Sequence, residues 1–487
     1  MTARAIPLLL LLLVFASVAG AQAPVNRAEL GQQAYAAGKM PEALEHFLAA
    51  LQGQPGHAVL LCWVGSTYLQ TGQLPQAESA LKQCLAADPR YAVGHNNLGN
   101  VYLAQGRLAE AEASYSQAVA IDGNYFDAHY NLANLYLRQG RDAKAWNEYT
   151  RALKINPNDY EAHLNFGVAL QKVGEVAKAI EHYEAAHRLR ADDNRLLVTL
   201  GAMYLKVERF PEARARYEEA LKREPDSAEA NLGLGIALHH LKQPQEALTY
   251  LRRGEELDPH SFAAKYNQGL VYAAVGDLKA AEEAYRKALE LQADDAMCLN
   301  NLGGVVFQQN RVEEAVDLFG RAVKADGTLA VARVNLALAL EGAGRKDEAF
   351  NQWKIAAERF PEEAAAHSGL GNAYYERKQY PPALAAYLRS LGLEPGNPQA
   401  ENNVGLIYLT QGSLDMAAAH FRSALKANPR FAQAANNLGV VLERMGKIED
   451  AKTQYRKALE IDPQCRPAQD NLKRLGQSDK PGEAAVG

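Results

Sequence analysis

The chain has 487 residues, 22% of them charged, and a formal net charge of −5 at pH 7. This acidic balance argues against non-specific binding of nucleic acid, which needs a basic surface. The sequence contains no Gly-rich phosphate loop, nucleophile elbow or zinc motif, so it offers no catalytic signature.

Residues 1–23 have the features of a secretory signal peptide. Arg4 precedes an apolar run from Ile6 to Val18, and Ala21 and Ala23 form an Ala-x-Ala cleavage site. The run is shorter than the roughly 18 residues that a membrane span needs. We expect cleavage near Ala21 or Ala23 and a periplasmic protein. Secretion, and an uncleaved anchor, are the alternatives.

From residue 24 to about 465, alanine recurs at a fixed step of 34 residues. The series is Ala43, Ala77, Ala111, Ala145, Ala179, Ala213, Ala247, Ala281, Ala315, Ala349, Ala383, Ala417 and Ala451. A strict period of this length is typical of stacked repeats. We count position 1 of a repeat at residue 24 and at every 34th residue after it, so these alanines occupy position 20.

Each repeat is predicted to contain two antiparallel helices. Apolar residues at positions 4, 7, 8 and 11 define one helix face, and those at 20, 24 and 27 define a second. Gly at or near position 15 ends the first helix, and Pro at position 32 ends the second. Small residues at 8, 20 and 27 let the helices approach, while large residues at 7, 11 and 24 fill the remaining space.

This pattern resembles the tetratricopeptide repeat (TPR) family over about nine tenths of the chain. Position 8 is Gly or Ala in all thirteen copies, and position 24 is aromatic in eleven. The resemblance implies an all-α, right-handed superhelix (an α-solenoid) of thirteen helix-turn-helix repeats over residues 24–465. Residues 466–475 read as a capping helix, with Pro467, Ala468 and Leu472 facing the repeats. The polar residues 476–487 are expected to be disordered.

Two groups of side chains raise other possibilities. Cys62 and Cys84 occupy positions 5 and 27 of one repeat, at similar height, so they either form a disulfide or pack as small apolar residues. Histidine stands at position 4 in four repeats: His95, His129, His163 and His367. Successive repeats lie too far apart for these rings to share an ion, so we expect half-buried histidines, with no metal and no cofactor.

One pattern exceeds what packing demands: position 6 is Asn in eight repeats. Asparagine is unfavourable inside a helix because its side chain competes for backbone hydrogen bonds. In the TPR family, positions 2, 5, 6, 9, 12 and 13 of the first helix face a concave groove. The row resembles the asparagine ladder of O-GlcNAc transferases and is similar in principle to that of importin-α. It is predicted to bind the backbone of an extended peptide; the alternative is that it bonds to the neighbouring helix. The residues are Asn97, Asn131, Asn165, Asn267, Asn301, Asn335, Asn403 and Asn437.

An apolar floor in the middle repeats also favours a protein ligand. It consists of Leu164, Val168, Leu232, Ile236, Tyr266 and Leu270, beside the position-9 amides Asn100 and Asn134. The Lys and Arg clamp of chaperone-binding family members is absent from positions 2, 5 and 6 of adjacent repeats.

The sequence therefore predicts a non-catalytic, exported scaffold that binds an extended protein segment in its groove, in envelope assembly or secretion. The alternative is a substrate-selecting partner of a separate glycosyltransferase. We expect a protein or peptide ligand, no nucleic acid, and membrane contact only through partners. The oligomeric state stays open.

Overall fold

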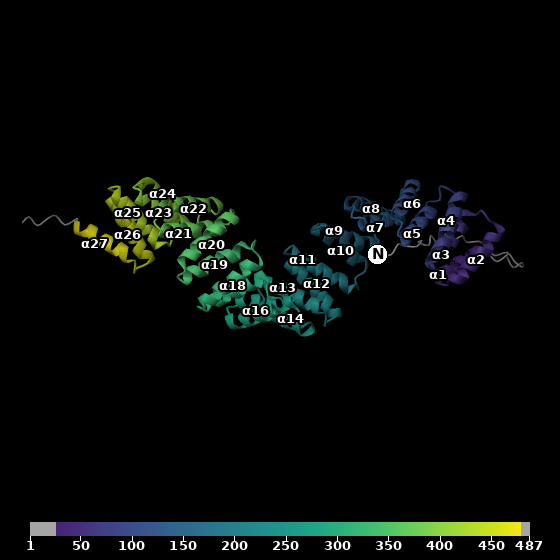
Figure 1. Ribbon diagram of the computed structural model, residues 1–487, viewed down its shortest axis with the longest axis horizontal. Helices are drawn as coiled ribbons and strands as arrows, with labels where there is room; N and C mark the ends of the chain where they lie inside the picture. Colours follow the sequence, from purple (N-terminus) through teal and green to yellow (C-terminus); the bar gives the residue numbers. More distant parts are fainter. Residues whose placement is uncertain (1–25, 479–487) are drawn as a thin grey trace, which may run out of the picture. The chain divides into compact units, whose positions relative to one another are not determined.

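The computed structural model describes residues 26–478, and the predicted signal peptide and residues 479–487 lie outside this range. Within it the secondary structure consists of 27 helices and no strand. Within each of its two units, Figure 1 shows them stacked in chain order, so that each helix packs mainly on its neighbours in sequence. This is the helix-on-helix architecture of an α-solenoid. The chain divides into two compact units, one ending at Leu241 and the other beginning at Lys242.

From α3 to α26, first helices of 13 residues alternate with second helices of 14, at positions 1–13 and 17–30 of the repeat. The helices of the first unit are α1 (Arg27–Ala36), α2 (Met40–Gly53), α3 (Ala58–Gln70), α4 (Leu74–Ala87), α5 (Ala92–Ala104), α6 (Leu108–Ile121), α7 (Phe126–Arg138), α8 (Asp142–Ile155), α9 (Tyr160–Lys172), α10 (Val176–Leu189), α11 (Asn194–Lys206), α12 (Phe210–Arg223) and α13 (Ala228–His240).

The second unit continues the alternation. Its helices are α14 (Pro244–Leu257), α15 (Phe262–Ala274), α16 (Leu278–Leu291), α17 (Ala296–Gln308), α18 (Val312–Ala325), α19 (Ala330–Gly342), α20 (Lys346–Arg359), α21 (Ala364–Glu376), α22 (Tyr380–Leu393), α23 (Pro398–Thr410), α24 (Leu414–Ala427), α25 (Ala432–Arg444), α26 (Ile448–Ile461) and α27 (Arg466–Ser478).

The small residue at position 8 leaves room for the large side chain at position 24 of the same repeat. A Cβ atom added to Gly201 would lie 2.6 Å from the Tyr217 ring, and one added to Gly303 would lie 2.8 Å from the Phe319 ring. Both distances are shorter than normal contacts, so the ring lies directly against the helix backbone. The position-20 alanines are at most 1% exposed, which lets the second helix approach closely.

The turn between the two helices needs a left-handed residue at position 15. Nine of these residues are glycines, such as Gly106 and Gly276, and all have positive φ. The other four, Glu208, Lys242, Asn310 and Lys378, adopt the same conformation with φ between 56° and 63°. The turn geometry is thus kept even where the favoured residue is missing.

The last helix, α27, begins at Arg466 as the sequence predicts but continues to Ser478 rather than ending at 475. Ala468 is fully buried, Leu475 is 6% exposed and Leu472 packs on the same core. Pro467, predicted to face the repeats, is exposed instead. The buried residues thus follow the spacing i, i+4, i+7, which excludes Pro467 from the contact face.

Candidate binding groove

The position-6 asparagines hold neighbouring repeats together. In seven of the eight predicted sites, Nδ2 donates a hydrogen bond to a side chain at position 5 or 9 of the preceding repeat. The acceptors are Ser66 Oγ for Asn97 (2.9 Å), Asn96 Oδ1 for Asn131 (3.0 Å), the Tyr130 hydroxyl for Asn165 (2.5 Å), the Tyr266 hydroxyl for Asn301 (2.9 Å), Asn300 Oδ1 for Asn335 (2.9 Å), Asn372 Oδ1 for Asn403 (3.2 Å) and Asn402 Oδ1 for Asn437 (3.0 Å).

The eighth, Asn267, donates to Ala263 O of its own helix at 2.7 Å. The terminal helix repeats the inter-repeat contact, with Asn471 Nδ2 donating to Asn436 Oδ1 at 3.1 Å. The sequence predicts hydrogen bonding to the neighbouring helix as the alternative to peptide binding. In the structure, the side-chain N–H groups of these asparagines, except Asn267, make such bonds.

Exposure separates the predicted groove residues into three groups. Asn97 and Asn131 are 1% exposed and Asn100 is 4% exposed, too buried to touch a ligand in this conformation. Val168 is 43% exposed. The remaining residues are half-buried: Asn134, Asn165, Asn267, Asn301, Asn335, Asn403, Asn437, Leu164, Leu232, Ile236, Tyr266 and Leu270.

The position-9 asparagines satisfy buried tyrosine hydroxyls. The Tyr115 hydroxyl donates to Asn100 Oδ1 at 2.7 Å, and the Tyr149 hydroxyl donates to Asn134 Oδ1 at 2.5 Å. Burial raises the pKa of both phenols, so they remain donors at neutral pH. Where position 9 is apolar, as at Val168, the buried hydroxyl uses position 12 instead, and Tyr183 donates to Gln171 Oε1 at 2.7 Å. Position 9 of the first helix is therefore polar in some repeats and apolar in others.

An open cavity of about 260 Å³ lies among the first helices α5, α7 and α9 of the first unit. Its apolar lining comes mainly from Leu103, Leu137 and Val168. Asn134 also lines it, and because the Tyr149 hydroxyl occupies Oδ1, what this side chain can offer a ligand is its N–H group. Of the predicted site residues, the cavity brings together Val168 and Asn134.

Arg138 and Lys172 border the same cavity, and sequence reasoning missed them. Both occupy position 13, and the next two repeats carry Lys206 and His240 there. The signal was present in the sequence as four consecutive basic residues at one groove-facing position. The negative net charge of the whole chain drew attention away from this local basic pattern.

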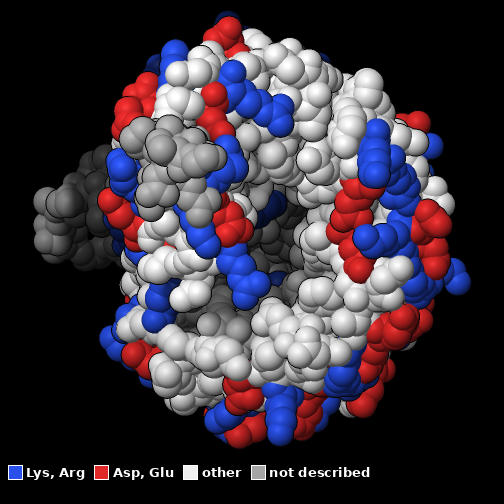
Figure 2. All heavy atoms as spheres, turned by 90° about the vertical axis from the view of Figure 1, so that its left-hand side faces the viewer, with Lys and Arg blue, Asp and Glu red and all other residues white. Residues whose placement is uncertain are grey.

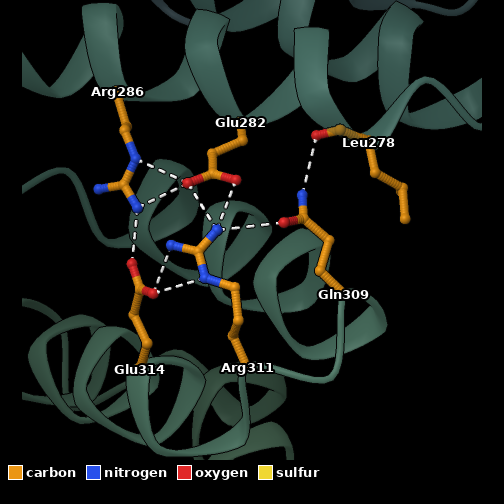
Figure 3. Close-up of polar contacts among 6 residues, drawn as sticks. All are labelled: Leu278, Glu282, Arg286, Gln309, Arg311 and Glu314. Atoms are coloured by element: carbon orange, nitrogen blue, oxygen red, sulfur yellow. Dashed lines mark hydrogen bonds and ion pairs between the residues drawn. The ribbon is translucent and has the colours of Figure 1, made fainter.

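Many other cations of the array are paired with carboxylates. Figure 3 shows one such cluster, in which Arg311 and Arg286 both contact Glu282 and Glu314. These hydrogen bonds help to hold the pKa of Glu282 below its ordinary value against the opposing effect of burial. The Arg at position 16 makes the same link between repeats at Arg107–Glu78, 3.0 Å, and Arg141–Glu112, 2.6 Å. The face in Figure 2 accordingly shows Lys and Arg interspersed with Asp and Glu.

The position-4 histidines belong to the connections between repeats. Each places Nε2 about 3 Å from the backbone oxygen of position 32 in the preceding repeat, as His95 does with Pro89 O at 3.0 Å. His129 is 2% exposed, more buried than predicted, and its Nδ1 lies 2.5 Å from Glu148 Oε2. Among residues 26–478, no group of three His, Cys, Asp or Glu side chains is placed to hold a metal ion.

Cys62 and Cys84 are buried free thiols in this structure. A hydrogen bond between the two side chains lowers the pKa of Cys62 and raises that of Cys84. Asn97 Nδ2 also lies 3.4 Å from Cys62 Sγ. The two sulfurs are thus neighbours, and whether they form a disulfide stays a prediction.

Comparison with known families identifies the repeat. Two tetratricopeptide-repeat models match residues 199–262, 334–398 and 404–464, and residues 261–328, which together exceed half of the chain. The chain belongs to the TPR family. Residues 16–196 match the model of the C-terminal domain of cilia and flagella-associated protein 70, which carries a TPR designation. No curated protein matches.

Two solved structures match this chain at low similarity. The Cut9–Hcn1 hetero-tetramer of the APC/C has 14% identity and a TM-score of 0.42, covering 92% of this chain and 95% of its own. YrrB, described as a TPR protein with an unusual peptide-binding site, has 24% identity and a TM-score of 0.35. It covers 39% of this chain and 99% of its own. None of the helices in the described part of the chain is long and apolar enough to cross a membrane.

Proposed function

We propose that this TPR protein is a non-catalytic scaffold that binds an extended protein segment along the face of its first helices. The observation that carries the proposal is the open apolar cavity between α5, α7 and α9, with Val168 left 43% exposed within it. Concave, mostly apolar clefts that carry a few polar groups are the usual form of a ligand-binding site.

The ligand surface would extend beyond the cavity along positions 5 and 9. Leu164, Leu232 and Ile236 supply half-buried apolar side chains in the same unit. Tyr266 and Leu270 continue this pattern in the second unit. The half-buried position-6 asparagines would contact the ligand mainly through carbonyl oxygens, because their N–H groups are already engaged between repeats. An extended segment suits this surface because its side chains can follow the repeat from helix to helix.

Export to the periplasm, for a role in envelope assembly or secretion, is part of the proposal. It is supported by Arg4, the apolar run from Ile6 to Val18 and the site at Ala21–Ala23. Fractionation of a bacterial host should place the protein in the periplasm, with a mature N-terminus at residue 22 or 24. Leu11→Arg in the apolar run should hold it in the cytoplasm. An unprocessed wild-type chain in the cytoplasm would contradict export.

A second candidate is a substrate-selecting partner of a separate glycosyltransferase. The row of asparagines favours it, since it resembles the row in O-GlcNAc transferases. This candidate predicts that the purified chain raises the activity of a co-purifying glycosyltransferase toward protein substrates. The scaffold proposal predicts no such enhancement.

Photo-crosslinking tests the binding face directly. A benzoylphenylalanine replaces Val168 on α9 in one variant and Leu189 at the end of α10 in the other. The two side chains are similarly exposed, at 43% and 40%, and belong to the same repeat. We expect protein adducts from position 168 and few from position 189. Equal adducts from both, or adducts from 189 alone, would contradict a first-helix binding face.

A further inference from the structure

Four successive first helices of the first unit end with a basic side chain on the groove-facing position 13. These residues, Arg138, Lys172, Lys206 and His240, are called the basic stripe here, and all four are exposed. A basic residue in the last turn also interacts favourably with the helix dipole, but that would apply to every first helix. In the second unit α15, α17, α19, α21 and α23 have no basic residue in the last turn, and only α25 ends with one, Arg444. Helix stability therefore does not account for the stripe.

The cations of the stripe have no carboxylate partners, a property that they share with a number of other exposed cations of the described chain. Within the described part of the chain, Arg138, Lys172 and Lys206 form no ion pair, whereas Arg107, Arg141 and Arg311 each bind a carboxylate of the preceding repeat. His240 stacks on Phe210 with the ring centroids 4.2 Å apart. The stripe thus offers positive charge that the protein itself leaves uncompensated.

The stripe and the apolar cavity form one surface, because Arg138 and Lys172 line the cavity together with Leu103, Leu137 and Val168. The cavity volume of about 260 Å³ is below the roughly 300–1,000 Å³ of small-molecule pockets. It therefore suits one large apolar side chain flanked by negative charge.

We propose that the segment bound by the first unit is acidic, with a large aliphatic or aromatic side chain in the cavity and Asp or Glu side chains on the basic stripe. This inference rests on the proposed function and specifies its ligand. Neighbouring helices lie roughly 10 Å apart and an extended chain advances about 3.3 Å per residue. A carboxylate at about every third residue of the segment would therefore reach the basic side chain of each successive repeat.

An acidic peptide fits this surface better than a nucleic acid does. The stripe supplies one cation per repeat beside aliphatic walls, whereas single-stranded nucleic acid is bound by denser positive charge and by exposed aromatic rings on which bases stack. The net charge of −5 repels a long polyanion. A short acidic segment can still bind, because it contacts only the local basic surface.

The test is a selection of displayed dodecapeptides on the purified full chain. Three proteins are compared: the wild type, the stripe variant R138Q/K172Q/K206Q and the control variant R90Q/R188Q/K222Q. The control replaces three exposed cations that lie outside the first helices, and it has the same net charge as the stripe variant. Circular dichroism melting confirms that both variants fold.

We expect the wild type and the control to enrich peptides with Asp or Glu about every third residue around a Leu, Ile or Phe. The stripe variant should bind the best of these peptides roughly tenfold more weakly, and raising the salt concentration should reduce that difference. Enrichment without an acidic bias would overturn the inference and leave the proposed function standing. No enrichment by any protein would overturn both. Tighter binding of a single-stranded oligonucleotide than of any selected peptide, lost in the stripe variant, would overturn it in favour of nucleic acid.

Discussion

The two units follow the same packing rules but present different chemistry at the same groove-facing position. In the first unit, position 13 carries Arg138, Lys172 and Lys206, all without carboxylate partners in the described chain. In the second unit this position is basic only in α25, at Arg444, and in α21 it is Glu376, which pairs with Lys346 at 2.7 Å. Positions 8, 15, 20 and 24 determine how a repeat packs, so they are alike in both units. Positions on the open face are free to differ, and ligand preference is therefore encoded there.

The largest expected effect concerns the packing rule that both units share. Gly303→Leu should drive a side chain into the Phe319 ring and destabilise the protein by about 1–3 kcal/mol. Gly201→Leu should do the same in the first unit, against Tyr217. The adjacent Gly304 is the control, because a Cβ there meets nothing within 4 Å, and Gly304→Leu should be neutral or slightly stabilising. Urea unfolding measures all three, and equal effects at 303 and 304 would refute the rule.

A second prediction separates the two interpretations of the position-6 row. Asn131 is buried and donates to Asn96 and Asn100, so Asn131→Ala should cost about 1–3 kcal/mol by removing the donor for buried acceptors. Half-buried Asn335 makes the same contact to Asn300, and Asn335→Ala should cost about 0.5–1.5 kcal/mol. Unchanged melting temperatures, combined with weaker peptide binding, would instead favour the peptide ladder.

The third prediction compares position 23 in the two units. In the first unit, burial and the nearby His163 lower the pKa of His182 to about 4. His163 Nδ1 and His182 Nδ1 lie 2.9 Å apart. The unfolded chain, with an ordinary pKa near 6.5, therefore binds more protons than the folded chain between about pH 6.5 and 4. The free energy of unfolding is therefore highest above pH 6.5 and decreases as the pH falls toward 4. The decrease is about 1–2 kcal/mol after allowing for partial solvent contact.

His182→Gln should flatten this part of the stability–pH curve measured by denaturant titration. The equivalent residue of the second unit is His420, which faces Glu401 Oε2 at 2.6 Å instead of another imidazole. His420→Gln should therefore leave the slope assigned to His182 in place. A slope unaffected by His182→Gln would contradict the assignment.

The smallest expected effect concerns the four turns without glycine. Glu208→Gly in the first unit and Lys378→Gly in the second should each stabilise the protein by about 0.5–1 kcal/mol, because φ is positive at both residues. The alanine variants at the same positions should give no such gain. Loss of stability in both glycine variants would show that the Glu208 and Lys378 side chains stabilise the fold by more than their positive φ angles destabilise it.

The fold was predictable because packing leaves periodic marks in the sequence. Gly201 and Tyr217 belong to one repeat, and their spacing alone identifies the contact between its helices. The partner of Asn131 was not predictable, because a mid-helix amide can bond to a neighbouring repeat or to a ligand, and both demand the same residue. The stripe of Arg138, Lys172 and Lys206 was visible in the sequence. Its lack of carboxylate partners, however, depends on which side chains the stacking brings together.

Hydrogen–deuterium exchange with and without a selected acidic peptide tests the central claim most directly. If the segment lies on the first helices of the first unit, protection should rise in α5, α7, α9, α11 and α13. The second helices α6, α8 and α10 should change little, and the first helices of the second unit should change less than those of the first. Protection confined to the second helices, or equal protection of first helices in both units, would contradict the account.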